Sequence, residues 1–141
     1  MAETETAAQA TAPTLSAGVI AHLNPSDANA AAAFYTRAFG AQEISRIPAQ
    51  DGKRLMHVHL HLNGGTLMLA DSFPESGHPV QTPQGFSLVV VVDDIDAWWK
   101  RAIAAGAKPV MEPQKMFWGD LYAQLEDPFG YLWSLDEPVK G

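Results

Sequence analysis

The stretch Asp27–Gly40 (DANAAAAFYTRAFG) combines a capping acid, a run of helix formers and a terminating glycine. Asp27, or Ser26 before it, suits the N-terminal cap of a helix, and Gly40 suits the C-terminal cap. Apolar side chains recur at helical spacing and form one face: Ala31, Phe34, Tyr35 and Ala38. The sequence therefore predicts a helix over about residues 28–39, entered from a short strand at 18–23.

The residues on either side of this helix predict a module that occurs twice. Strands are expected at about 42–47, 55–62 and 66–70, and Asn63-Gly64-Gly65 between the last two is a strong hairpin signal. The second half predicts a strand at 86–92, a helix capped by Asp93 or Asp94, and strands at 108–111, 121–125 and 131–135. Capping acid and terminating glycine are 13 residues apart in both halves, from 27 to 40 and from 93 to 106. Two β-α-β-β-β modules, about 18–71 and 86–136, predict an α+β fold with an irregular linker at 71–84.

Composition limits the classes of function. The chain has 141 residues, enough for one ordinary domain, and 16 acidic against 9 basic side chains give a net charge of −7 that disfavours nucleic-acid binding. It has no cysteine, which excludes disulfides, thiolate metal sites and cysteine nucleophiles. No apolar run approaches the ~20 residues of a membrane span, and residues 1–16, with two glutamates and no Lys or Arg, predict a disordered tail. We expect one cytoplasmic domain over residues 17–138, with neither nucleic acid nor membrane as a partner.

Five motifs carry a resemblance to a known superfamily: Ala33–Ala41 (AFYTRAFGA), Gly64–Asp71 (GGTLMLAD), Val91–Asp96 (VVDDID), Phe117–Asp120 (FWGD) and Asp127–Leu135 (DPFGYLWSL). Together they resemble the vicinal-oxygen-chelate superfamily of glyoxalase I, bleomycin-resistance proteins and extradiol dioxygenases, and within it the PhnB-like branch. The resemblance implies a half-barrel of mixed sheet around a concave cavity, with the helices on the outer side. It also implies a homodimer with two equivalent cavities near the interface. This fold hosts several chemistries, so the resemblance is strong for the fold and weak for the reaction.

Metal-dependent members of this superfamily place four His, Gln or Glu ligands on the concave faces of the strands. The resemblance implies that the equivalent positions here are Ile20, Met68 (or Leu69), Ser87 (or Phe86, if Asp93 is the cap) and Ser134. None of these side chains is a credible ligand for a divalent cation. The sequence also has Leu121 and Tyr131 where the PhnB-like branch often has arginine and histidine. We therefore predict no cofactor, which disfavours glyoxalase or dioxygenase chemistry.

Three histidines, His57, His59 and His61, alternate with aliphatic residues in the predicted strand (HVHLHL, residues 57–62). A period of two places the imidazoles on one face, opposite Thr66, Met68 and Ala70, and the aliphatic side chains beneath the helices. His22 is expected on the same face. Two interpretations remain open: the histidines bind a divalent metal, or they line a polar pocket. Side chains at i and i+2 lie about 7 Å apart, which favours the pocket.

A loop and its neighbours supply the other candidates. Phe117 and Trp118 precede Gly119 and are expected either to contact a ligand or to plug the end of the cavity. Asp120 either accepts a hydrogen bond from His57 or His59 and acts as a base, or caps its own turn. At least one of Trp98 and Trp99, together with Trp133, is expected in the core, and Asp127 and Pro128 are expected to serve turn geometry.

Two functions fit these residues. The first is a metal-free protein of the bleomycin-resistance type that binds a small amphipathic or aromatic molecule through His22, His57, His59, His61, Met68, Phe117, Trp118 and Ser134. The second is a lyase, isomerase or dioxygenase-type enzyme that uses a non-standard metal or none, with His57, His59 and Asp120 as catalytic candidates and His22 beside them. A purely structural partner-binding module is the least supported, because the sequence has no polybasic tract and no evident docking helix.

Overall fold

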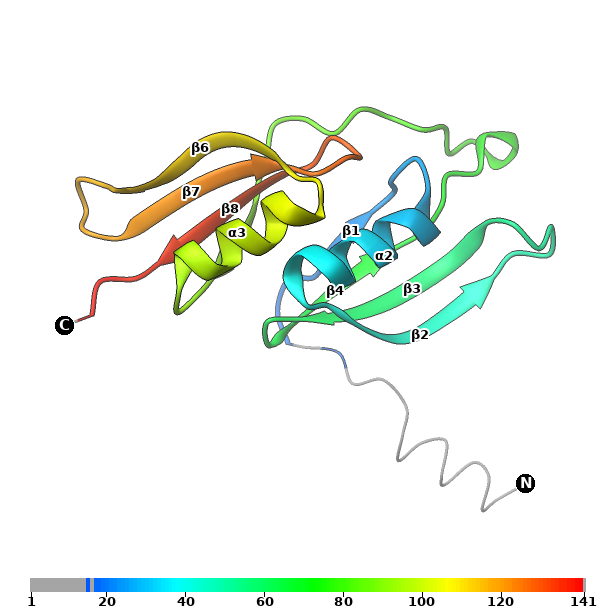
Figure 1. Ribbon diagram of the computed structural model, residues 1–141. Helices are drawn as coiled ribbons and strands as arrows, with labels where there is room; N and C mark the ends of the chain where they lie inside the picture. Colours follow the sequence, from blue (N-terminus) through cyan, green and yellow to red (C-terminus); the bar gives the residue numbers. More distant parts are fainter. Residues whose placement is uncertain (1–14, 16, 141) are drawn as a thin grey trace, which may run out of the picture.

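The computed structural model of the chain describes Leu15 and residues 17–140 (Figure 1), so the predicted tail lies almost entirely outside the described residues. The first module contains, in chain order, β1 (Ala21–Leu23), α2 (Ala28–Phe39), β2 (Gln42–Pro48), β3 (Leu55–Leu62) and β4 (Gly65–Leu69). Its sheet has the order β1-β4-β3-β2, in which β1 is parallel to β4 and the other neighbours are antiparallel.

The second module repeats this arrangement with β5 (Leu88–Val91), α3 (Ile95–Ala105), β6 (Lys108–Lys115), β7 (Leu121–Glu126) and β8 (Leu132–Glu137). Its sheet order is β5-β8-β7-β6, again with one parallel pair at β5 and β8. The linker between the modules contains one short 3-10 helix, η1 (Pro74–Ser76). The predicted α+β class and the module repeat are confirmed.

The helix boundaries follow the capping signals. Asp27 accepts a hydrogen bond from the backbone N–H of Ala30, and the first helix ends at Gly40, whose φ of 71° lies in the left-handed region. In the second helix the cap is Asp94, which accepts from Ala97, and Gly106 ends the helix. Since Asp94 rather than Asp93 is the cap, the acid and the glycine are 12 residues apart in this module, not 13.

Several strands differ in extent from the prediction. β1 and β5 are shorter than 18–23 and 86–92, because their parallel pairing covers only three and four residues. β6 is longer than 108–111 and continues to Lys115, where it still pairs with Leu121. The strand contains Pro109 and Pro113, but β6 is an edge strand with register shifts beside both prolines, where a missing N–H is tolerated. The turn between β3 and β4 has two residues, Asn63 and Gly64, both with positive φ.

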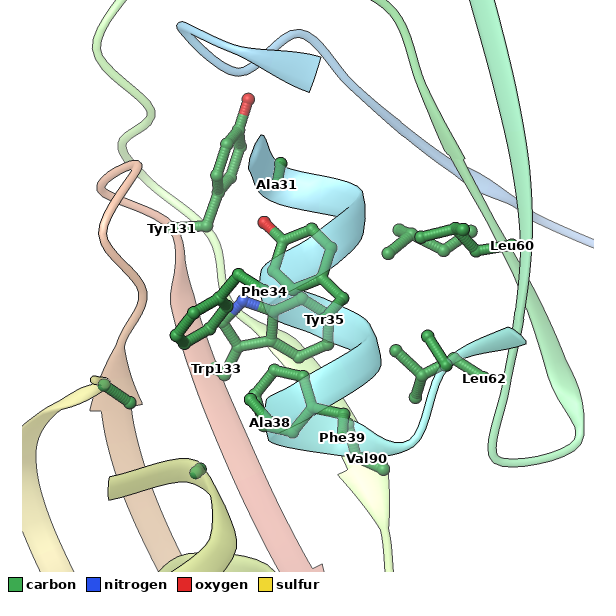
Figure 2. Packing of buried hydrophobic residues seen from close by; sticks show 14 of the residues in the cluster. Ala31, Phe34, Tyr35, Ala38, Phe39, Leu60, Leu62, Val90, Tyr131 and Trp133 are labelled. Atoms are coloured by element: carbon green, nitrogen blue, oxygen red, sulfur yellow. The ribbon is translucent and has the colours of Figure 1, made fainter. Parts of the chain in front are cut away.

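An aromatic cluster joins the two modules (Figure 2). Tyr35 and Phe39 of α2 lie 5.2 and 4.5 Å, between ring centroids, from Trp133 of β8 in the other module. Trp98 of α3 is half-buried and stacks on Phe39 at 6.4 Å, and Trp133 is fully buried, as predicted. Because these rings come from both halves of the chain, the core holds the modules together as one body.

A buried carboxylate lies within this cluster. Asp127 accepts hydrogen bonds at Oδ2 from the Tyr35 hydroxyl (2.5 Å) and the Trp133 indole N–H (2.9 Å), and at Oδ1 from the backbone N–H groups of Phe129 and Tyr131. The Oδ1 contacts are the predicted turn geometry, whereas the Oδ2 contact with Tyr35 joins residues 92 positions apart. Burial first, and then the charge of Asp127, raise the pKa of Tyr35 far above its usual value, so its hydroxyl remains a donor.

The two sheets are not hydrogen-bonded to each other as one continuous half-barrel. Along the seam where β1 and β5 form the sheet edges, the side-chain amide of Asn63 donates to the carbonyl of Val91 at 2.6 Å. A cavity of about 410 Å³ follows this seam, lined by β1, the β3–β4 hairpin and β5. Each sheet packs one face against the core and leaves the other face open.

Candidate functional site

The open face of the first sheet carries the histidine row. Met68 of β4 is the register partner of both His22 in β1 and His59 in β3, and His59 pairs in turn with Ser45 of β2. His61 pairs with Thr66, and the aliphatic residues between the histidines pair with the Leu67 and Leu69 side in the core. The predicted assignment of faces is confirmed.

The histidines of this row differ in exposure. His59, in the middle of β3, is only 3% exposed, His57 is half-buried, and His22 and His61 are exposed. Burial lowers the pKa of His59, and the charges of His57 and His61 lower it further. His59 therefore presents a neutral imidazole near pH 7, which can accept a proton or ligate a cation.

The open face of the second sheet carries a hydroxyl network. The Tyr122 hydroxyl donates to Ser134 Oγ at 2.8 Å, Gln124 Nε2 donates to the same oxygen at 3.2 Å, and Ser134 Oγ donates to Ser87 Oγ at 3.2 Å. Ser134 is fully buried, so these contacts satisfy both lone pairs and the proton of its hydroxyl. Val89 is the register partner of Ser134 on this face and is more than half exposed.

Exposed aromatic rings adjoin this network. The Phe117 side chain is 96% exposed, and its ring meets Trp118 edge-on at 4.8 Å between centroids. Trp118 is half exposed and meets Tyr122 edge-on at 5.9 Å. The rings thus form a short ladder from solvent to the Tyr122–Ser134 hydrogen bond, and Phe117 fills no cavity within the chain.

Asp120 lies in the second module, away from the histidines. Its Oδ1 accepts a hydrogen bond from the backbone N–H of Val139, and the loop that carries it is at the end of the molecule remote from β3 (Figure 1). The pKa of Asp136 is raised by burial and by the neighbouring Asp120 carboxylate, so the two acids face each other. The considered hydrogen bond from His57 or His59 to Asp120 does not form within one chain, because β3 and β7 belong to separate sheets.

The four positions implied for metal ligands lie on these faces but offer few donors. Ile20 has only a hydrocarbon side chain, Met68 offers a thioether, and the Ser134 hydroxyl is committed to Tyr122, Gln124 and Ser87. Among the described residues, no three His, Asp or Glu side chains lie close enough together to hold a metal ion. The three β3 histidines spread along the strand instead of converging on one point.

Two features of the chemistry were not found from the sequence. Asp127 bridges the modules through a partner that no local pattern indicates. Ser72, in the linker, is buried with a hydroxyl that has no hydrogen-bond partner. The surroundings of these two polar groups are set by the tertiary structure and not by residues near them in the sequence.

Comparison with known proteins agrees with this architecture. Residues 17–135 match the family model of the Glyoxalase/Bleomycin resistance protein/Dioxygenase superfamily, and the chain belongs to that superfamily. Uncharacterized protein Mb0911c of Mycobacterium bovis is 42% identical over 125 residues, covering 84% of this chain and 82% of the relative. TioX of Micromonospora sp. ML1 is similar in structure, with a TM-score of 0.70 and 26% identity over 88% of this chain and 100% of that chain.

Glyoxalase I of Zea mays also has a TM-score of 0.70, but at 19% identity it shows the fold alone; the match covers 86% of this chain and 44% of that chain. No helix within the described part of the chain is long and apolar enough to cross a membrane.

Proposed function

We propose that the protein binds a small amphipathic or aromatic molecule on the open faces of its sheets, without a divalent metal. The observation that carries this proposal is the exposed Phe117–Trp118 pair beside the satisfied hydroxyls of Tyr122 and Ser134. Ligand sites combine apolar and aromatic walls with a few fixed polar groups. Here the exposed rings form the wall, and the half-buried Tyr122 and Gln124 are the polar groups beside it. The histidine row offers further polar groups on the other sheet.

Metal-free binding is supported by the side chains at the four implied ligand positions. A hydrocarbon at Ile20, a thioether at Met68 and a Ser134 hydroxyl that is already fully bonded do not fit a hard divalent cation. No step of the proposed function therefore passes through a metal.

A homodimer is part of the proposal. Val89 and Val91 on the second open face and Ile47 on the first are each more than half exposed, and burial of such apolar surface favours association. A second copy placed over these faces would enclose the ligand between two sheets. Sedimentation velocity tests this point, because a monomer across the micromolar range would contradict it.

We further propose that the chain belongs to the PhnB-like branch, which the motif Phe117–Asp120 resembles, and that the protein is located in the cytoplasm.

The binding proposal is tested with the fluorescent dye 1-anilinonaphthalene-8-sulfonate as an amphipathic aromatic probe. We expect saturable binding that Trp118→Ala weakens about tenfold, since one aromatic contact contributes on the order of 1.4 kcal/mol. The matched control is Val110→Ala, which removes an exposed apolar side chain of the edge strand β6 and should leave the affinity unchanged. Equal affinities for wild type and Trp118→Ala would contradict the proposal.

A second candidate function is a lyase, isomerase or dioxygenase-type enzyme. The observation that favours it is the buried, neutral imidazole of His59 between two other histidines on an open face. Elemental analysis of the purified protein separates the candidates, because a stoichiometric metal would favour the enzyme and contradict metal-free binding. In calorimetric titrations with zinc or nickel, a heat of binding that is lost in His59→Gln and kept in His78→Gln would locate that metal on the histidine row.

A further inference from the structure

A second cavity lies beneath the linker that joins the modules and meets the open face of the first sheet at His22. Its volume is about 450 Å³, which is within the usual range for small-molecule sites. One wall is linker residues 72–86, which arch over the top of the molecule in Figure 1, and the other includes the end of β1 and Tyr131 before β8. We refer to it as the linker cavity.

The base of this wall is firmly held. Asp71 accepts hydrogen bonds from the backbone N–H groups of Ala28 and Leu55, at 2.8 and 2.7 Å. Arg54 pairs with Glu75 at 2.6 Å and lies over the Phe73 ring at 4.3 Å. The start of the linker is thereby fixed to α2 and β3, so the cavity has a defined wall.

Ser72 lines this cavity and carries a buried, unpartnered hydroxyl. The residue is 7% exposed, and its Oγ has no hydrogen-bond partner among the residues that the structure describes. Leaving a buried hydroxyl unpaired costs on the order of 1–3 kcal/mol, so such groups in folded proteins call for an explanation. A bound molecule with a hydrogen-bond acceptor would supply one.

The charge of the lining indicates which acceptor. The chain as a whole is acidic, yet none of the described residues that line the linker cavity is Asp, Glu, Lys or Arg. Its polar groups include two imidazoles, His22 and His78, besides the Ser72 hydroxyl. Imidazole N–H and hydroxyl groups donate to an anion, and no lining carboxylate repels it.

The remaining wall suits an apolar body. The ring of Phe86 meets that of Tyr131 at 6.2 Å between centroids, and Phe86 is half exposed. Pro83 packs at the Gly130 turn, where a methyl group added at that glycine would lie 3.4 Å from the proline ring. A planar molecule on this wall would cover apolar surface that the chain leaves exposed.

We propose that the linker cavity binds a small aromatic carboxylate. Ser72, His22 and His78 would hydrogen-bond the carboxylate, and Phe86 and Tyr131 would contact the ring. This site is separate from the proposed site on the open faces, with His22 at its edge.

The test titrates the full-length protein with benzoate, followed by calorimetry and by amide NMR shifts. We expect saturable binding in which Ser72→Ala and His78→Gln each weaken the affinity about tenfold or more, the effect of one hydrogen bond to a charged group. The neutral analogue benzyl alcohol should bind at least tenfold more weakly than benzoate. The matched control, Ser76→Ala, changes an exposed serine of the same linker that does not line the cavity, and it should bind benzoate like the wild type.

Ser72→Ala also distinguishes binding from folding. Because the hydroxyl has no partner within the described part of the chain, its removal should leave the urea midpoint unchanged or raise it, while benzoate binding falls. A lowered midpoint would show an internal partner and overturn the inference. No saturable binding at millimolar benzoate, equal binding of benzyl alcohol, or binding lost in Trp118→Ala but not in Ser72→Ala would overturn it as well.

Discussion

The hydrogen bonds of Asp127 lead to the sharpest prediction about stability. In Asp127→Asn, the remaining oxygen can still serve the turn N–H groups of Phe129 and Tyr131. The new NH₂ group then faces the indole N–H of Trp133, and two donors cannot bond to each other. The Tyr35 hydroxyl, which donates to the carboxylate at 2.5 Å, can then only accept a weaker, neutral hydrogen bond from that NH₂ group.

The expected cost of this substitution follows from those contacts. One buried donor left unpaired costs about 1–3 kcal/mol, and the lost charge assistance on the other adds about 1 kcal/mol, so Asp127→Asn should cost about 3 kcal/mol. For a domain of this size that corresponds to a Tm lower by about 10 °C. Urea unfolding followed by tryptophan fluorescence measures the free energy, because Trp133 lies inside the cluster.

The double mutant tests the mechanism. Tyr35→Phe alone should cost about 1.5–3 kcal/mol, since it removes a hydrogen bond to a carboxylate. In the Asp127→Asn background it should cost about 1.5 kcal/mol less, because the hydroxyl has already lost its strong acceptor. The control pair, Tyr122→Phe with Asp127→Asn, should be additive within about 0.5 kcal/mol, as expected for distant sites. Additive Tyr35 and Asp127 effects would refute the reasoning.

Three further predictions concern other parts of the chain. Because the pKa of Tyr35 is raised in the folded protein, its contribution to stability is present below pH ~10 and is lost as the pH rises further, by about 1.4 kcal/mol per pH unit. Urea unfolding midpoints measured between pH 9 and 11.5 should show this slope in the wild type, and Tyr35→Phe should lose it. Gly119→Ala should lower the melting temperature more than Gly64→Ala does. Both glycines have positive φ, but only a Cβ at Gly119 would overlap another side chain, that of Val139 at 2.6 Å. Adding Val139→Ala to the Gly119→Ala variant should bring its melting temperature close to that of Gly64→Ala. The depressed pKa of His59 means that stability is lost as the pH falls below about 6.5; an NMR titration in which the His59 ring protonates at or above that pH would contradict the assignment.

The fold could be predicted from the sequence because its signals are local. Asp27 and Gly40 are close enough in the chain to define a helix by themselves, and Asn63-Gly64 defines the hairpin register that separates the histidine face from the core. The position of Asp120 could not be predicted in this way. Its partners, Val139 and Asp136, are set by how the C-terminal segment packs against the β6–β7 hairpin.

The buried environments of Asp127 and Ser72 could not be predicted from the sequence either. Asp127 sits in Asp-Pro-Phe-Gly, a sequence that explains two of its four hydrogen bonds as turn geometry and gives no sign of Tyr35. Ser72 has no periodic neighbours that mark it as buried, because the linker around it has no regular structure beyond η1. Burial in such a segment depends on what the rest of the chain places over it.

The core and the candidate sites can be tested separately, because the polar side chains of the sites lie on the faces of the sheets that do not form the core. The aliphatic residues that alternate with the histidines, and those that alternate with Ser134 and Tyr122, are buried against the helices and the aromatic cluster. Substitutions of exposed residues such as Trp118 or His61 therefore remove no contact that joins the modules, and surface substitutions of this kind usually change stability by less than about 0.5 kcal/mol. A loss of ligand affinity in those variants reports on binding, whereas a loss in Asp127→Asn would be confounded with unfolding. Because the two open faces belong to separate sheets, any ligand that contacts both must bridge the seam or lie between two chains, so the oligomeric state and the binding stoichiometry must be measured together.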